Sequence, residues 1–291
     1  MVFLMFDTYI LPILEYNCEI WTSEKSVSEL ENLQLGYLKN VLGVRKQTPS
    51  LAVYGETGRF PLHIRHKARL INYWVRLENM ADHKILKRCL YIQKDMHSDG
   101  NCKTWLDKVS QILQNCDIHY NIYDTGRHNL ECVGSRVKLK LYEIEQTKLM
   151  ESINDSTQQP KLRTYKLFKT DCRLEPYLLL RHSSKIITKI ARFRTSSHSL
   201  RIETGRHQRP KIPVADRVCE KCSLNVTEDE RHCLIICPNH QTYQNELFQT
   251  AENLINNFRS LDDTGKFVAI MGCKEAKMHI GLGKFLQQAD V

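Results

Sequence analysis

The chain has no apolar run of membrane-spanning length and no recognisable export signal. Its most apolar stretch, residues 1–6, lacks a basic flank, and Asp7, Glu15 and Glu19 interrupt the apolar pattern that follows. A membrane span needs about 20 predominantly apolar residues. We therefore expect no membrane partner, and we expect a buried helix at the start of the chain.

A paired cysteine framework is missing as well. The chain has 11 cysteines among 291 residues, which is an odd number. Seven of them are scattered singly, at Cys18, Cys89, Cys102, Cys116, Cys132, Cys172 and Cys273. Disulfide-stabilised proteins carry even sets of cysteines and fold in oxidising compartments. The pattern instead predicts free thiols and an intracellular protein, whether nuclear or cytoplasmic.

What the chain does contain is a compact set of metal-ligand residue types between residues 219 and 237. A Cys-x-x-Cys pair, Cys219 and Cys222, is followed after nine residues by His232 and then by Cys237. Two thiolates from one tight turn, joined by a further thiolate and an imidazole, suit a tetrahedral zinc ion. Four protein ligands leave no position for water, so the motif predicts structural zinc.

Spacing alone leaves the second ligand pair open. Cys233 and Cys237 are four residues apart and would share one face of a regular helix, whereas His232 precedes Cys237 by five. His240, three residues beyond Cys237, is another candidate ligand. Buried thiols without any metal are the alternative interpretation.

Positive charge is concentrated directly before this motif. The net charge is +9, and the window from Arg181 to Arg217 opposes its cations with Glu203 and Asp216 only. Such a cluster predicts contact with nucleic acid, although a solvated surface is the plainer alternative. The predicted nucleic-acid-binding residues are Arg181, Lys185, Lys189, Arg192, Arg194, Arg201, Arg206, Arg209 and Lys211. The first four are spaced by four, four and three residues, which predicts one shared helix face.

Apolar residues recur at helical spacing through most of the chain. One predicted helix ends at Gly43, another runs from Pro61 to Met80, and a polar stretch at 154–164 predicts a linker. We therefore predict a mainly α fold, with a bundle-like N-terminal region and then a helical region carrying a small zinc-knuckle module. The expected parts are residues 1–80, a helical connector and linker at 81–160, and a basic helical region at 161–291. This last part includes the knuckle at 219–237 and the C-terminal helices.

Two segments resemble one protein family. Residues 11–21, Leu-Pro-Ile-Leu-Glu-Tyr-Asn-Cys-Glu-Ile-Trp, are similar to the segment that follows the polymerase palm in reverse transcriptases of non-long-terminal-repeat (LINE-type) retrotransposons. That family usually has glycine at the position of Asn17. Residues 33–43, with Arg45 and the following Thr48-Pro49, look like the next helix of the family, which belongs to the thumb.

The knuckle resembles the Cys-Cys-His-Cys motif near the C-terminus of the same polyproteins. Its His-x-Leu-x-x-Cys-Pro pattern is matched by His232, Leu234, Cys237 and Pro238. This match favours His232 over Cys233 as a ligand. The resemblance covers about residues 1–80 and 180–285, and it implies a thumb-like region followed by a connector and a zinc knuckle.

Polymerase carboxylates are lacking. The family's Tyr/Phe-x-Asp-Asp strand, which would hold two metal ions, is absent and is expected upstream of residue 1. No RNase H-like carboxylate set is evident, and Asp262-Asp263 precedes Thr264-Gly265 as a turn or helix cap would. The resemblance therefore implies no enzymatic activity in this chain.

The resulting hypothesis is a non-catalytic fragment that binds RNA or DNA through a basic surface beside a structural zinc site. A zinc-dependent protein-interaction module is one alternative, and a functionless translated remnant of a retroelement is another. A protein partner, including the upstream polymerase region, is a further expectation.

Overall fold

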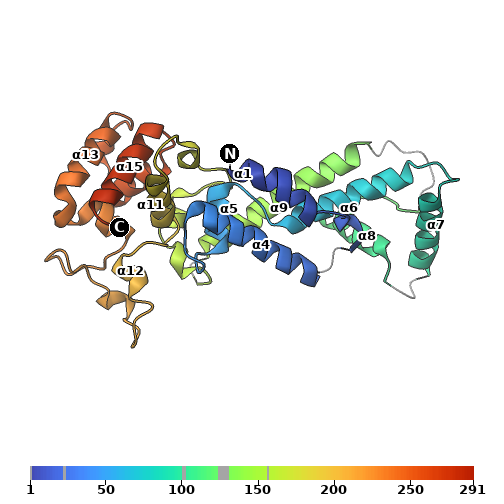
Figure 1. Cartoon of the computed structure of the whole chain (residues 1–291), viewed down its shortest axis with the longest axis horizontal. Helices are drawn as coiled ribbons and strands as arrows, with labels where there is room; N and C mark the ends of the chain where they lie inside the picture. Colours follow the sequence, from blue (N-terminus) through green and yellow to red (C-terminus); the bar gives the residue numbers. More distant parts are fainter. Residues whose placement is uncertain (1, 22–23, 100–102, 124–130, 156) are drawn as a thin grey trace. The chain divides into compact units, whose positions relative to one another are not determined.

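The structure, a computed structural model, describes residues 2–21, 24–99, 103–123, 131–155 and 157–291 (Figure 1). Helices α1 to α15 and short 3-10 or π turns form the secondary structure of these ranges, which contain two isolated β-bridges and no β-strand. The predicted mainly α fold is confirmed. Within the same ranges no helix is long and apolar enough to cross a bilayer.

The chain divides into two compact units. Unit 1 comprises Met1–Gln34 and Phe60–Thr147, and unit 2 comprises Leu35–Arg59 and Lys148–Val291. These units do not follow the expected boundaries at residues 80 and 160. The expected parts were contiguous in sequence, whereas each unit combines two separate segments.

Unit 1 contains α1 Val2–Met5, the π turn η1 Phe6–Ile10, α2 Leu11–Leu14, α3 Cys18–Trp21, the first part of α4 Glu24–Leu42, α6 Leu62–Glu78, α7 Ile85–Ser98, α8 Trp105–Asn115 and the first part of α9 Glu131–Asn154. Its apolar core surrounds Trp74 of α6, which is fully buried together with Leu106 of α8 and Val137 of α9. Removal of these side chains from water is the main term that stabilises the unit.

The start of the chain is helical but only partly buried. Phe6 and Leu11 are buried, whereas Leu4, Met5 and Tyr9 are exposed. The expectation of a buried first helix is therefore wrong for most of its apolar residues, because short helices that pack on one side leave the other side in solvent.

Unit 2 contains the end of α4, α5 Ser50–Thr57, the end of α9, η2 Pro160–Leu162, α10 Tyr165–Phe168, η3 Pro176–Leu179, α11 Ser184–Arg194, α12 Arg201–Thr204, η4 Val214–Asp216, η5 His232–Ile236, η6 Pro238–His240, α13 Gln241–Glu252, η7 Phe258–Ser260, α14 Asp263–Gly272 and α15 Ala276–Gln288. Helix α15 packs against both α11 and α13 (Figure 1). Two glycines permit this approach: a Cβ on Gly283 would collide with Ile186, and one on Gly281 would lie 3.3 Å from Leu247.

Several local predictions are confirmed. Gly43 ends α4 with a left-handed φ of 65°, and Pro61 precedes α6. Asp262 caps α14, since its side chain accepts a hydrogen bond from the amide of Gly265 at 2.8 Å. The predicted linker is too long, because Leu162 is fully buried in η2.

Candidate metal centre

The Cys-x-x-Cys pair lies on a narrow hairpin-like loop of unit 2. Val218 and Thr227 form an antiparallel bridge, and the amide of Cys219 donates to the carbonyl of Val226 at 2.9 Å. Asn225 adopts a left-handed φ of 52°, a conformation that asparagine tolerates better than most residues. This backbone arrangement brings both thiols of the pair to one end of the loop.

The second pair is carried by the π turn η5. The amide of Cys237 donates to the carbonyl of His232 at 2.8 Å, so the hydrogen bond joins residues five apart. A π turn widens the helix by one residue and thereby places His232 and Cys237 on the same side. The Asp229 side chain accepts a hydrogen bond from the amide of His232 at 2.7 Å and satisfies this otherwise unpaired donor.

The four predicted ligand atoms converge. One ligand atom from each residue lies within 4.8 Å of all the others in the group formed by Cys219, Cys222, His232 and Cys237. The Sγ atoms of Cys219 and Cys237 are 3.9 Å apart, and Cys222 Sγ is 3.5 Å from His232 Nε2. Four atoms at roughly 2.3 Å from one central ion would be about 3.8 Å from one another. The cluster therefore has the composition and dimensions that could hold a metal ion.

The other two candidate ligands lie outside this group. Cys233 is buried, with its amide donating to the carbonyl of Asp229 at 3.0 Å. The His240 ring makes an edge contact with Phe285, with centroids 6.0 Å apart. The structure thus brings His232 to the cluster and leaves Cys233 and His240 out of it.

The protonation of these groups depends on whether a cation is present. In its absence burial raises the pKa of the Cys219 thiol to about 12 and also raises the pKa of Cys237. Burial lowers the pKa of His232, so its imidazole remains neutral and can act as a ligand. A divalent cation would reverse the preference of the thiols by stabilising their thiolates.

Two buried side chains support the cluster. One carboxylate oxygen of Glu228 lies 3.8 Å from Cys219 Sγ, and the other accepts a hydrogen bond from the amide of Arg201 at 2.8 Å. The Gln244 amide of α13 donates to the carbonyl of Cys237 at 3.2 Å. The nearby carboxylate adds negative charge that favours a cation, and both side chains tie the loop to helices.

A buried ionic network adjoins the π turn, and the sequence patterns did not reveal it. Glu230 accepts hydrogen bonds from the Arg163 guanidinium at 2.8 and 2.9 Å, from His198 at 2.9 Å and from Ser196 at 3.1 Å. Burial alone would raise the pKa of Glu230, but Arg163 and His198 lower it to about 2. Arg163 lies within the predicted linker at 154–164, where no local pattern indicates a buried partner.

Arg194 does not belong to the predicted basic surface. Its side chain is 2% exposed and pairs with Glu56 at 2.8 Å and with Glu175 at 3.0 Å. Its guanidinium also donates to the carbonyl of Met271. This correction follows from its position on the buried side of α11.

Four more of the predicted contacts are engaged within unit 2. Lys189 donates to the carbonyl of Val291 at 2.8 Å, Arg201 pairs with Glu220, and Arg206 pairs with Glu203 at 3.2 Å. Arg192 is exposed but donates to the carbonyl of Gly43 at 2.7 Å. The remaining predicted contacts are exposed, at Arg181, Lys185, Arg209 and Lys211. The helix face predicted to carry Arg181, Lys185, Lys189 and Arg192 is shorter than expected. Helix α11 begins at Ser184, so Arg181 precedes it.

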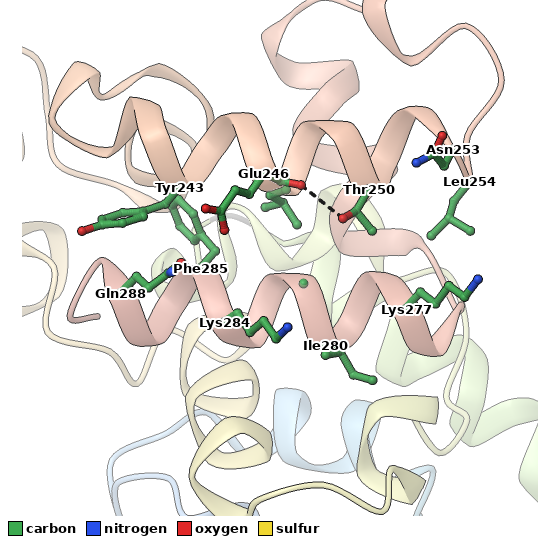
Figure 2. A pocket seen from close by; sticks show the side chains of 12 residues that line it. Tyr243, Glu246, Thr250, Asn253, Leu254, Lys277, Ile280, Lys284, Phe285 and Gln288 are labelled. Carbon is green, nitrogen blue, oxygen red and sulfur yellow. Dashed lines mark hydrogen bonds between the residues drawn. The ribbon is translucent and has the colours of Figure 1, made fainter.

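Unit 2 also has an open groove between α13 and α15 (Figure 2). It measures about 460 Å³, and Lys277, Ile280 and Lys284 project from α15 along it. The Thr250 hydroxyl at its α13 wall donates to the carbonyl of Glu246 at 3.1 Å, which is an intrahelical bond. The lining lacks a convergent set of acids, bases or nucleophiles, so no chemistry is assigned to it.

Comparison with protein-family models, with curated proteins and with solved structures finds no match for this chain.

Proposed function

We propose that Cys219, Cys222, His232 and Cys237 bind one zinc ion with a structural role. The observation that carries this proposal is the convergence of three thiols and one imidazole within 4.8 Å. Zinc accepts this mixture of sulfur and nitrogen ligands in tetrahedral sites, and four protein ligands leave no position for a reacting water.

Elemental analysis of the purified chain tests the zinc site. The wild-type protein is expected to carry about one zinc per chain, and the Cys219→Ser/Cys222→Ser double variant is expected to carry none. Cys233→Ala is the matched control, because Cys233 is a buried thiol in the same turn that lies outside the ligand group. Full zinc retention by the double variant, or loss of zinc from the Cys233 variant, would contradict the assignment.

We also propose that unit 2 binds the backbone of nucleic acid without catalysing a reaction. Support comes from cations that surround the loop after α4, which we call the 43–47 patch: Lys39, Arg45, Lys46, Lys161 and Arg192. Arg192 Nε donates to the carbonyl of Gly43 at 2.7 Å, and Lys161 Nζ donates to the carbonyl of Gln47 at 3.3 Å. Residues far apart in sequence therefore contribute positive charge to one loop.

Three cations of this patch donate to neutral carbonyls, and within the described ranges no carboxylate forms an ion pair with the patch. The Lys39 ammonium donates to the carbonyl of Lys46 at 2.7 Å, and burial together with the nearby Lys161 charge lowers the pKa of Lys39. Mutual repulsion of this kind is relieved when phosphates approach. If the patch neutralises five phosphates, the log–log salt slope of binding should be about −3.5 for single strands and −4.5 for duplex DNA.

Gel shifts at several salt concentrations, with both RNA and DNA, test this surface. Replacement of Lys46, Lys161 and Arg192 by alanine should make the slope shallower by about 2 to 3. The control is the Lys103→Ala/Arg136→Ala/Lys138→Ala variant, which removes the same charge from exposed positions of unit 1. Equal losses in both variants would contradict a specific surface. No shift at low salt would favour the protein-interaction module instead.

We further propose that the chain derives from the C-terminal region of a LINE-type reverse transcriptase. Support comes from the order of the two resembling segments, residues 11–21 before the Cys-Cys-His-Cys cluster. The genomic sequence directly upstream of Met1 tests it. A continuing frame with the palm carboxylates is the expected finding, and an unrelated upstream sequence would contradict the derivation.

A further inference from the structure

Helix α7 of unit 1 has its polar and apolar faces reversed relative to an ordinary surface helix. Lys87 and Lys94 are 5% and 6% exposed. By contrast, Ile85 is 77% exposed, Ile92 58% and Met96 40%. A surface helix normally turns its apolar stripe toward the core and its charges toward solvent.

The buried lysines are matched by one buried carboxylate. Lys87 Nζ donates to the carbonyl of Glu78 at 2.8 Å, and Lys94 Nζ lies 2.9 Å from the Glu78 carboxylate. The Trp74 indole also donates to this carboxylate at 3.1 Å. The contacts with Glu78 therefore keep the lysine face of α7 turned toward the rest of unit 1. Leu90, on the same helix, belongs to the apolar core.

The outer face carries a regular apolar stripe. Its members Ile85, Cys89, Ile92 and Met96 are all exposed and are spaced by four, three and four residues. This spacing forms the seam by which one helix packs against another.

Charges along the stripe have a definite polarity. Lys84 and Arg88 lie at its N-terminal end, and Asp95 and Asp99 lie at its C-terminal end. The helix dipole favours the opposite order, with acids first and bases last, so helix-end stabilisation does not account for them. Within the described ranges these four side chains have no ion pair.

We propose that the α7 stripe is a homodimer interface in which two copies of this chain pair antiparallel about a two-fold axis. In this register Ile85 faces Met96 of the second copy, and Cys89 faces its Ile92. The same arrangement brings Arg88 to Asp95 and Lys84 to Asp99 of the second copy, and the two-fold axis repeats every contact. Parallel pairing about a two-fold axis would put this charged flank of the two helices on opposite sides of the seam, so Arg88 would not meet Asp95.

The proposed interface is small, so we expect the dimer to have low affinity. A helix of 14 residues is about 21 Å long. A surface of this size buries less than about 1,000 Å², as weak and transient interfaces do, and we expect a Kd on the order of 10 µM.

Sedimentation equilibrium of the full chain, with zinc present and thiols kept reduced, tests the proposal. The wild type should show a monomer–dimer equilibrium, and Ile92→Glu should raise its Kd by at least about tenfold because a charge enters the seam. Leu139→Glu is the control, since Leu139 is a 66% exposed apolar residue of α9 and is not a member of the stripe, and the Kd of this variant should equal that of wild type. A monomeric wild type at about 200 µM, or equal effects of the two variants, would overturn the proposal.

Charge reversal tests the antiparallel register. Arg88→Glu and Asp95→Lys should each raise the Kd several-fold, because each sets like charges opposite one another twice per dimer. The Arg88→Glu/Asp95→Lys double variant restores opposite charges and should return the Kd to within about threefold of wild type. Additive weakening in the double variant would overturn this register. Far-UV circular dichroism of every variant shows that the helices remain folded.

Discussion

Both units bury ion pairs, but within the described residues unit 2 alone also buries a group of metal-ligand side chains. The core of unit 1 is an apolar cluster around Trp74, supplied by helices α6, α8 and α9, with the Glu78 carboxylate and its two lysines beside it. Unit 2 buries the Arg194–Glu56 and Arg163–Glu230 ion pairs together with the Cys-Cys-His-Cys cluster. Apolar cores tolerate changes in proportion to lost volume, whereas a buried charge or metal ligand that loses its partner is costly at once. The two units should therefore respond to different perturbations.

The tryptophans separate the two responses experimentally. All three of them, Trp21, Trp74 and Trp105, lie in unit 1. Tryptophan fluorescence thus reports the unfolding of unit 1, and hydrogen exchange of the relevant segments reports unit 2.

Metal removal is expected to have the largest effect on folding stability, and this effect should be confined to unit 2. Because metal binding to such clusters contributes folding free energy on the order of 10 kcal/mol, chelation should unfold the loop and the π turn. Hydrogen exchange of residues 217–240 should rise sharply, while tryptophan fluorescence stays unchanged. A change in tryptophan fluorescence on chelation would show that unit 1 also depends on the metal, and would contradict the proposed difference between the units.

Removal of the Arg194 charge should destabilise unit 2 by about 3–5 kcal/mol, since it leaves Glu56 buried without its main partner. Burial favours the neutral carboxyl of Glu56, but the Arg194 charge lowers its pKa and keeps it ionised. Denaturant unfolding of Arg194→Met, followed by circular dichroism, checks the magnitude. The Arg194→Met/Glu56→Gln variant should recover part of the loss, and no recovery would mean that packing of Arg194 matters more than its charge.

Local sequence patterns predicted the features that depend on neighbouring residues. The Cys-x-x-Cys turn, the end of α4 at Gly43 and the cap at Asp262 are set by a few adjacent residues, and all are present. The choice of His232 over Cys233 was different. A regular helix would have paired Cys233 with Cys237, and the π turn that reverses this preference has no residue type that specifies it.

Long-range pairing was beyond the sequence patterns. Arg194 looked like one more cation of a basic segment, and only the position of Glu56, 138 residues away, removes it from the surface. The orientation of α7 could not be predicted for the same reason. Its two buried lysines depend on ion pairs with Glu78, which lies on another helix. Charge clusters in a sequence therefore identify candidate surfaces, and tertiary contacts decide which charges remain available.

Loss of core volume should affect unit 1 alone. Leu106→Ala removes a fully buried side chain beside Trp74 and should lower the free energy of unfolding of unit 1 by about 2–4 kcal/mol. Urea unfolding followed by tryptophan fluorescence measures this loss. The zinc content and the exchange of residues 217–240 should remain as in wild type, and a fall in either would show that the units are not independent.

The smallest expected effect concerns His279, a buried histidine of unit 2. Burial and the nearby Arg194 charge lower its pKa to about 4, against about 6.5 when unfolded. A group with a lowered pKa takes up its proton more readily in the unfolded chain, so its contribution to stability is lost as the pH falls below 6.5. Between pH 7 and pH 5 this loss is about 2 kcal/mol. His279→Leu cannot titrate, so its unfolding free energy, measured by circular dichroism, should decline less over this range by that amount. Metal loss at low pH affects wild type and variant alike, so it cancels in the comparison. If the unfolding free energies of the two proteins fell in parallel with pH, His279 would be protonated as easily in the folded chain as in the unfolded one.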